Sequence, residues 1–180
     1  MKKNVKEIIT PIAVLACICL VVTALLAYIN LVTSPIIKEA EDKAAAEARA
    51  EVLSEADSFT PIDTENIPNL PEEVTEIYKA DNDTGYVFMM TVKGYGGDMK
   101  LICGIKSDGT IEKSKTLSHA ETSGLGSKTA DEPYRSQYTG INADTLDSVD
   151  TISGATISSN AYKKAIQSAL DAYDIVKEAK

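Results

Sequence analysis

The sequence predicts an α+β fold in which an antiparallel sheet with packed helices is preceded by a single N-terminal transmembrane helix. Three observations predict it. A charge-free apolar run lies near the N-terminus, several β-rich segments follow one another in the middle of the chain, and a segment with helical periodicity lies near the C-terminus. Helices that follow a group of antiparallel strands typically pack on their sheet.

The apolar run covers residues 8–33 and contains no charged residue. A helix needs about 20 apolar residues to cross a bilayer. A buried core helix would normally show a polar face, and the hydrophobic region of a signal peptide spans only about 7–15 residues. We therefore interpret residues 8–33 as an uncleaved transmembrane helix.

The charges that flank this run predict its orientation in the plasma membrane. The segment before the run contains three lysines, Lys2, Lys3 and Lys6, and one acidic residue, Glu7, whereas the charges beyond the run are mixed. Because positive residues stay on the cytoplasmic side, residues 1–7 are the predicted cytoplasmic tail of a single-pass protein. Beyond residue 33 the net charge is −11, which provides no electrostatic surface for nucleic acid.

Cysteine and histidine are too sparse for a metal centre. Cys17 and Cys19 lie inside the apolar run, Cys103 stands alone in a predicted strand, and His119 is the only histidine. No cysteine pair has the spacing of a zinc or iron–sulfur site, and no disulfide framework is expected. Packing is the favoured role for all three cysteines. No residue argues for a catalytic acid or base.

A helical stalk is predicted over residues 34–58, which are rich in alanine, glutamate and lysine. Ser34 and Pro35 resemble an N-cap followed by proline at the first helical position. We prefer a solvated stalk to a partner-binding helix. Residues 59–180 then form an extracytoplasmic domain, whose first part, residues 59–73, contains three prolines and is expected to be irregular.

The rest of the domain alternates strand signals with turns and ends in a helix. Asp108 and Gly109 form a hairpin signal between two of the strand segments. Apolar residues recur at three- and four-residue spacing over residues 159–177, which predicts a helix that Ser158 or Ser159 can cap. The predicted strands of the antiparallel meander are residues 74–80, 84–93, 99–106 and 110–118.

Small and hydroxyl-bearing residues are concentrated directly before the predicted C-terminal helix, in residues 150–159. The N-terminus of a helix offers unpaired N–H groups and a positive dipole end, which suit a phosphate. Gly154 and Ala155 would let the backbone approach a ligand closely. On the residues alone, an ordinary hydroxyl-rich loop with an N-cap is favoured over a phosphate site.

Residues 153–156 resemble the S-G-A-T flavinylation motif of the FMN-binding domain family, and Asp150 matches the acidic residue before it. The resemblance implies that FMN is attached covalently to Thr156 through a phosphoester, which a separate flavin transferase makes from FAD with release of AMP. Ser153, Gly154 and Ala155 are then the neighbours of the attachment residue.

A second segment, residues 119–126, resembles the H-x-E-T-P-G-L-G loop of the same family, with Ser123 at the usual proline. Residues 94–97 match its G-Y-G-G strand end. For the glycines of the loop, an ordinary turn is the alternative interpretation. The resemblance implies that the flavin is approached by Glu121, Thr122, Gly124 and Leu125, with Lys128 as a further candidate.

The resemblance covers about residues 74–175, and with the anchor the chain resembles the G subunits of Rnf electron-transport complexes. These complexes are ion-translocating ferredoxin:NAD oxidoreductases, and their G subunits share the FMN-binding domain with the C subunit of sodium-translocating NADH:quinone reductase. The implied function is electron transfer within a translocase, without catalysis by this chain alone. Other membrane subunits are the implied partners, because the sequence has no nicotinamide fingerprint and no iron–sulfur ligands.

Two alternatives remain. A stand-alone anchored FMN domain for extracytoplasmic electron transfer would share Thr156 and the anchor. A non-redox adhesion or sensor module would carry no flavin, so a yellow purified protein would exclude it.

Overall fold

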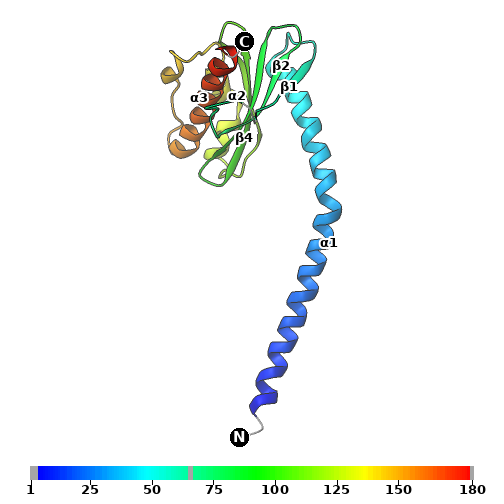
Figure 1. Cartoon of the computed structure of the whole chain (residues 1–180). Coiled ribbons are helices and arrows are strands. Elements are labelled where there is room, and N and C mark those ends of the chain that lie inside the picture. Colours follow the sequence, from blue (N-terminus) through cyan, green and yellow to red (C-terminus); the bar gives the residue numbers. More distant parts are fainter. Residues whose placement is uncertain (1–3, 65–66, 179–180) are drawn as a thin grey trace. The chain divides into compact units, whose positions relative to one another are not determined.

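The computed structural model describes residues 4–64 and 67–178 of the chain (Figure 1). It separates into two units, Met1–Lys43 and Ala44–Lys180. Helix α1 (Asn4–Val52) contributes most of its length to the first unit and its last turns to the second. The second unit contains a five-stranded sheet and the helix α3 (Thr156–Glu178).

The first unit confirms the predicted long apolar helix. An 18-residue window of α1 has a mean hydropathy of 2.9, and none of that window is buried. By length and composition this helix can cross a membrane. Pro35 lies inside α1, so the N-cap expected at Ser34 is wrong. A proline already has the helical φ and lacks one backbone donor, and here the helix continues past it.

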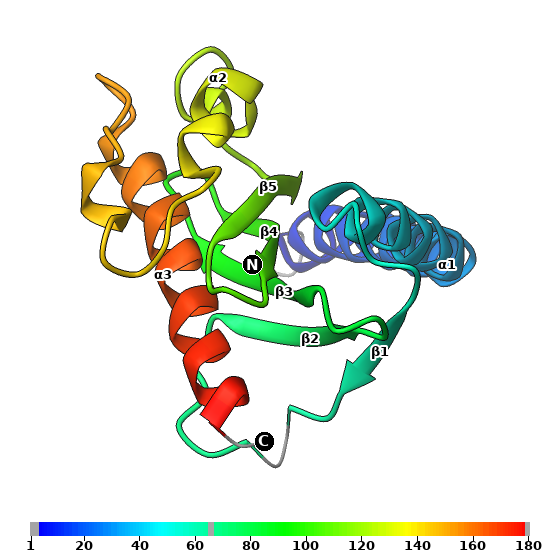
Figure 2. The same ribbon diagram turned by 90° about the horizontal axis from the view of Figure 1, so that it is seen from above.

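The sheet is the predicted antiparallel meander, because its strands are neighbours in sequence order (Figure 2). Gly109, in the turn before the last strand, has φ +89°, as the Asp-Gly hairpin signal requires. The strands are β1 (Phe59–Ile62), β2 (Val74–Ala80), β3 (Gly85–Lys93), β4 (Asp98–Lys106) and β5 (Ile111–Ser118).

Strand β1 corrects the expectation that residues 59–73 are irregular throughout. It contains Pro61 and pairs only with β2, so it forms an edge of the sheet. An edge strand tolerates proline because one side of its backbone needs no partner. The proline content of the segment therefore indicated an edge, and it did not exclude a strand.

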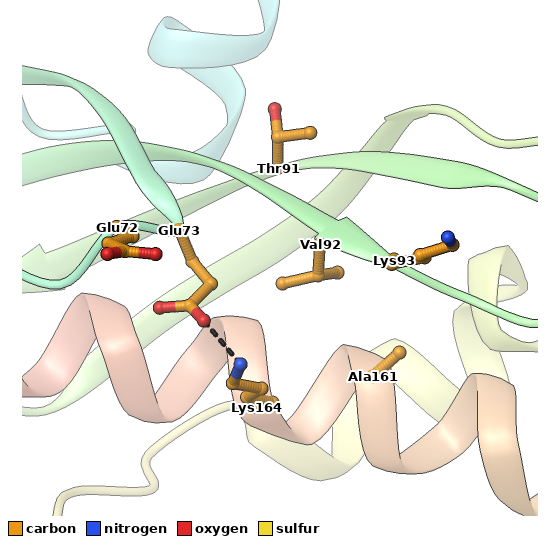
Figure 3. Close-up of a pocket in the computed structure, with 7 residues that line it drawn as sticks. All are labelled: Glu72, Glu73, Thr91, Val92, Lys93, Ala161 and Lys164. Atoms are coloured by element: carbon orange, nitrogen blue, oxygen red, sulfur yellow. Dashed lines mark ion pairs between the residues drawn. The ribbon is translucent and has the colours of Figure 1, made fainter.

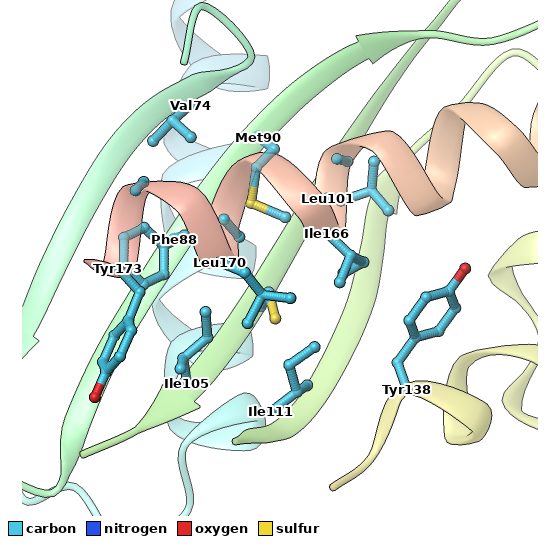
Figure 4. Packing of buried hydrophobic residues seen from close by; sticks show 14 of the residues in the cluster. Val74, Phe88, Met90, Leu101, Ile105, Ile111, Tyr138, Ile166, Leu170 and Tyr173 are labelled. Atoms are coloured by element: carbon cyan, nitrogen blue, oxygen red, sulfur yellow. The ribbon is translucent and has the colours of Figure 1, made fainter. Parts of the chain in front are cut away.

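Helix α3 packs on one face of the sheet, over β3 and β4 (Figures 2 and 4). Cys103 of β4 lies fully buried in this core, as predicted, and burial raises the pKa of its thiol. Large side chains that fill the same core include Phe88, Met90, Leu101, Ile105, Ile111, Tyr138, Ile166, Leu170 and Tyr173.

The opposite face of the sheet is covered by the last turns of α1. Ala48, Val52 and Leu53 pack against apolar side chains of β3 and β4 in a second, smaller core. Gly104 of β4 lies directly beneath this helix end, and any side chain there would clash with the carbonyl group of Val52. The end of the segment interpreted as a solvated stalk is thus part of the folded domain, and the helix stops at Val52.

The start of α3 differs from the sequence prediction, since the helix begins at Thr156 and not near residue 159. Ala155 accepts the first helical hydrogen bond, from the N–H of Ser159 at 2.9 Å. Ser158 and Ser159 therefore lie inside the first turn, where both are buried, and the expectation that one of them caps the helix is wrong. Serine usually favours loops and helix caps over helix interiors, so the helix was predicted to start too late in the chain.

An ion pair fastens the segment before β2 to α3. Lys164 pairs with Glu73 (Figure 3), and the hydroxyl of Ser168 donates to the second oxygen of the same carboxylate at 3.1 Å. The hydrogen bond from Lys164, followed by those from the backbone and from Ser168, holds the pKa of Glu73 below its ordinary value of 4.5. The contact therefore stabilises the fold only while Glu73 is ionised.

Replacing Glu73 with glutamine is expected to lower the free energy of unfolding at pH 7 by about 0.2–1 kcal/mol, as for a surface ion pair, here with an exposed lysine and a half-buried glutamate. The folded-state pKa is lowered, so this stabilisation is complete above pH 4.5 and is lost as the pH falls through the folded value. Urea unfolding of both proteins at several pH values measures it. Glu72→Gln changes an exposed neighbour and should have no effect; equal losses in the two variants would contradict the assignment.

Candidate functional site

A pocket of about 430 Å³ lies at the start of α3. Its volume falls within the range of about 300–1,000 Å³ that is usual for small-molecule sites. Three segments meet here: the turn between β3 and β4, the loop after β5, and the first turn of α3. The lining residues are Tyr95, Glu121, Thr122, Leu125, Gly126, Gly154, Ala155, Thr156, Ile157 and Ser158.

Thr156 is the first residue of α3, and its exposed side chain lines the pocket. The chain reaches this position through a tight turn in which the N–H of Ala155 donates to the carbonyl oxygen of Ile152 at 3.0 Å. Gly154 has φ +80° in this turn, a conformation that side chains disfavour. The small residues before Thr156 thus let the helix begin at the pocket, with Thr156 among the lining residues.

Glu121 is buried, with 8% of its surface exposed, and its carboxylate faces protein groups. One oxygen accepts the backbone N–H of Gly96 at 3.1 Å, and the other accepts the hydroxyl of Ser158. A side chain at Gly94 or Gly126 would collide with this carboxylate. Glu121 therefore links the loop after β5 to the β3–β4 turn and to α3.

Three exposed apolar side chains surround the pocket. Tyr95, Leu125 and Ile157 are exposed to 70%, 48% and 57% and are the exposed large hydrophobic side chains among the described residues of the second unit. Their gathering at one pocket is typical of a ligand site, because scattered exposed hydrophobics need no partner but a cluster does. Neither Tyr95 nor Ile157 was predicted from the sequence to be a site residue.

The structure brings together most of the residues that the two motifs indicate. Glu121, Thr122 and Leu125 line the same pocket as residues 154–156. Ser153, Gly124 and Lys128 do not line it. Gly124 instead forms a turn with φ +75°, in which its N–H donates to the hydroxyl of Ser127 at 2.9 Å. Contact between a flavin and any of the predicted site residues remains a prediction.

A cluster of buried tyrosines lies against the start of α3. The rings of Tyr134, Tyr138 and Tyr162 lie 5.1–5.7 Å apart. The hydroxyl of Tyr162 bonds to that of Ser114 at 2.8 Å, and Tyr134 donates to the carbonyl oxygen of Ser159 at 3.3 Å. Burial raises the pKa of Tyr138 and of Tyr162, so both phenols are neutral. The cluster was not predicted, since Tyr162 is distant in sequence from Tyr134 and Tyr138 and only the fold brings it to them.

Comparison with known proteins places this pocket in a family. The FMN-binding domain family matches residues 94–171, a stretch that contains all three segments of the pocket. The G subunit of the ion-translocating oxidoreductase complex of Methanosarcina acetivorans is 34% identical over 177 residues, which cover 92% of this chain and 94% of the relative. The chain belongs to this family of G subunits.

Two further G subunits are similar over most of their length. The G subunit of the proton-translocating ferredoxin:NAD(+) oxidoreductase complex of Clostridium ljungdahlii is 25% identical over 162 residues, 85% of this chain and 84% of the relative. The G subunit of the Na(+)-translocating ferredoxin:NAD(+) oxidoreductase complex of Acetobacterium woodii is 29% identical over 185 residues, 89% of this chain and 88% of the relative. The apolar helix α1 fits a single-pass subunit of such a membrane complex.

Proposed function

We propose that the chain is the membrane-anchored electron-transfer subunit of an Rnf-type ferredoxin:NAD oxidoreductase, with FMN attached through a phosphoester to Thr156. The observation that carries the proposal is that Thr156 lines the pocket where residues of the two flavin-family motifs meet. Membership of the G-subunit family and the FMN-binding domain over residues 94–171 support it.

The residues of the pocket fit an attached FMN. Thr156 opens α3, so a phosphate on its hydroxyl lies at the N-terminus of a helix, where backbone N–H groups and the dipole favour an anion. Tyr95, Leu125 and Ile157 provide exposed apolar surface for a flat aromatic ring. A covalent bond also keeps the cofactor at high local concentration outside the cell.

The attachment reaction uses FAD and a flavin transferase. The hydroxyl oxygen of Thr156 forms a bond to the FMN phosphorus of FAD, the bond between the two phosphates breaks, and AMP leaves while the hydroxyl proton is released. The chain contributes the acceptor hydroxyl and a loop that presents it. The exposed position of Thr156 suits this role, because the transferase must reach the hydroxyl.

Once attached, FMN supplies electron acceptance and donation. The chain would hold FMN through Thr156, and the apolar residues of the pocket would contact it. Other subunits of the complex bind ferredoxin and NAD, since the sequence has no nicotinamide fingerprint and no iron–sulfur ligands. One of the two relatives is named for a proton-translocating complex and the other for a Na(+)-translocating complex, whereas the function proposed for this chain is electron transfer.

Covalent flavin is tested by co-expressing the full chain with a flavin transferase in a host that exports it. The purified protein should be yellow and should fluoresce on a denaturing gel, with one flavin per chain by absorbance. A known acceptor protein in the same host controls for transferase activity. A dark gel band alongside a fluorescent control would remove the redox function and favour the adhesion or sensor module.

We expect residues 1–7 to lie in the cytoplasm and the folded domain to lie outside it. Protease added to spheroplasts should digest residues 44–180, whereas an N-terminal epitope tag should stay protected until the membrane is broken. The lysines before the apolar helix and the mixed charges after it give this orientation. A domain that survives until lysis would reverse it.

A further inference from the structure

Among the residues whose burial the structure describes, Glu121 is the only lysine, arginine, histidine, aspartate or glutamate that is buried. Burying a charge is costly unless hydrogen bonds or opposite charges compensate. Within the described part of the chain Glu121 forms no ion pair, and Lys128 in the same loop is exposed. The buried charge of Glu121 is compensated by hydrogen bonds from uncharged donors and by its position near the N-terminus of α3.

The partners of Glu121 come from three separate segments. The N–H of Gly96 belongs to the β3–β4 turn, and the hydroxyl of Ser158 belongs to the first turn of α3. The N–H of Glu121 itself donates to Nδ1 of His119 at 3.2 Å, which orders its own loop. The positive end of the α3 dipole further favours a carboxylate at this position.

The surrounding glycines leave room for this carboxylate and for little else. A Cβ at Gly94 or Gly126 would overlap its oxygens, and one at Gly96 would overlap the carbonyl group of Ala120. These glycines come from both loops that meet here. The close approach of the two backbones is thus matched to the buried carboxylate between them.

The helix geometry connects Glu121 to Thr156. Successive residues of an α-helix are about 100° apart around the axis, so Ser158 projects roughly opposite to Thr156. Ser158 is 2% exposed and faces Glu121, while Thr156 is exposed. A bond that holds Ser158 inward therefore fixes the direction in which Thr156 points outward.

We propose that Glu121 is a positioning residue, which clamps the first turn of α3 to the β3–β4 turn and so holds the group attached to Thr156 against the pocket. The inference rests on the proposed function for the identity of that group. Without the clamp, the first turn of α3 would loosen and an attached flavin would swing on its phosphoester.

The first test needs no flavin. Hydrogen exchange of the full chain, measured by mass spectrometry, should show about tenfold faster exchange at the hydrogen-bonded amides of Ala155 and Ser159 in Glu121→Ala, as expected for the loss of hydrogen bonds to a charged group. Glu121→Gln can still accept from Gly96 and can donate to Ser158, so it should restore slow exchange. Glu72→Gln controls for the loss of a negative charge elsewhere and should match the wild type.

Ser158→Ala removes only the helix end of the clamp and should also speed exchange at the amides of Ala155 and Ser159, while the second half of α3 stays protected. If Glu121→Ala fails to fold, this variant decides. Wild-type exchange in folded Ser158→Ala or Glu121→Ala would overturn the proposal, and so would equal acceleration in Glu121→Gln and Glu121→Ala.

The second test uses the flavinylated chain. Time-resolved fluorescence anisotropy should show faster local rotation of the flavin in Glu121→Ala and Ser158→Ala, together with stronger quenching by iodide, while Glu121→Gln resembles the wild type. Unchanged rotation and quenching in both clamp variants would overturn the proposal. If the wild type acquires no flavin, the proposed function fails, and the exchange experiment still decides whether the clamp exists.

Discussion

Replacing Thr156 with alanine is expected to abolish covalent flavin attachment completely, because the hydroxyl oxygen that forms the phosphoester is lost. The domain should remain folded, since Thr156 is exposed and a single hydrogen bond contributes only about 1 kcal/mol. The measurement is flavin fluorescence on a denaturing gel after co-expression with a flavin transferase, with circular dichroism as the check on folding.

Thr156→Ser is the matched control, because it keeps the hydroxyl and should retain attachment in part. Peptide mass mapping of the wild type should place the added FMN on the fragment that contains Thr156. Ser158 and Ser159 are buried in α3 and are poor acceptors of FMN, whereas Ser153 is exposed in the loop before Thr156. Flavin on Ser153, or undiminished fluorescence in Thr156→Ala, would show that the motif was misinterpreted.

Replacing Tyr162 with alanine should lower the free energy of unfolding by about 3–5 kcal/mol, the usual cost of removing a large buried ring. Tyr162 is fully buried, and its ring lies 5.1 Å from that of Tyr138 and 5.5 Å from that of Tyr134. The chain has no tryptophan, so the near-ultraviolet dichroism of its tyrosines can follow urea unfolding.

Tyr162→Phe separates the ring from its hydroxyl. It loses only the 2.8 Å hydrogen bond to Ser114, which leaves one buried hydroxyl unpaired, and should cost about 1–3 kcal/mol. Equal losses in the alanine and phenylalanine variants would mean that the hydrogen bond, and not the packed ring, supports α3. A loss under 1 kcal/mol for alanine would contradict a tightly packed cluster.

Local patterns predicted most of the sheet because β3 and β4 are rich in apolar residues and turn residues follow both strands. The Asp108-Gly109 turn, for example, has the backbone conformation that its residues require. The errors arose where a residue's local preference was overridden by its surroundings. Pro61 is tolerated at a sheet edge, and Ser158 enters the helix because Glu121 accepts its hydroxyl.

The site was predictable only as far as its motifs extend along the chain. Thr156 and Glu121 stand in recognisable segments, and the structure places both at one pocket. The inward direction of Glu121 could not be predicted, because it depends on Gly94 and Gly126 leaving space on either side. Ile157 was missed because only the fold reveals that Leu125 and Tyr95 lie at the same pocket.

The end of α1 is buried against the sheet, and this contact determines where the chain can be truncated. A soluble fragment cut at residue 59 would lack Ala48, Val52 and Leu53, and would expose Val87 and Ile102 to solvent. An uncovered apolar sheet face of this kind promotes aggregation. A fragment that begins at Ala44, where the second unit starts, keeps these side chains covered and is the one to express for crystallisation or spectroscopy.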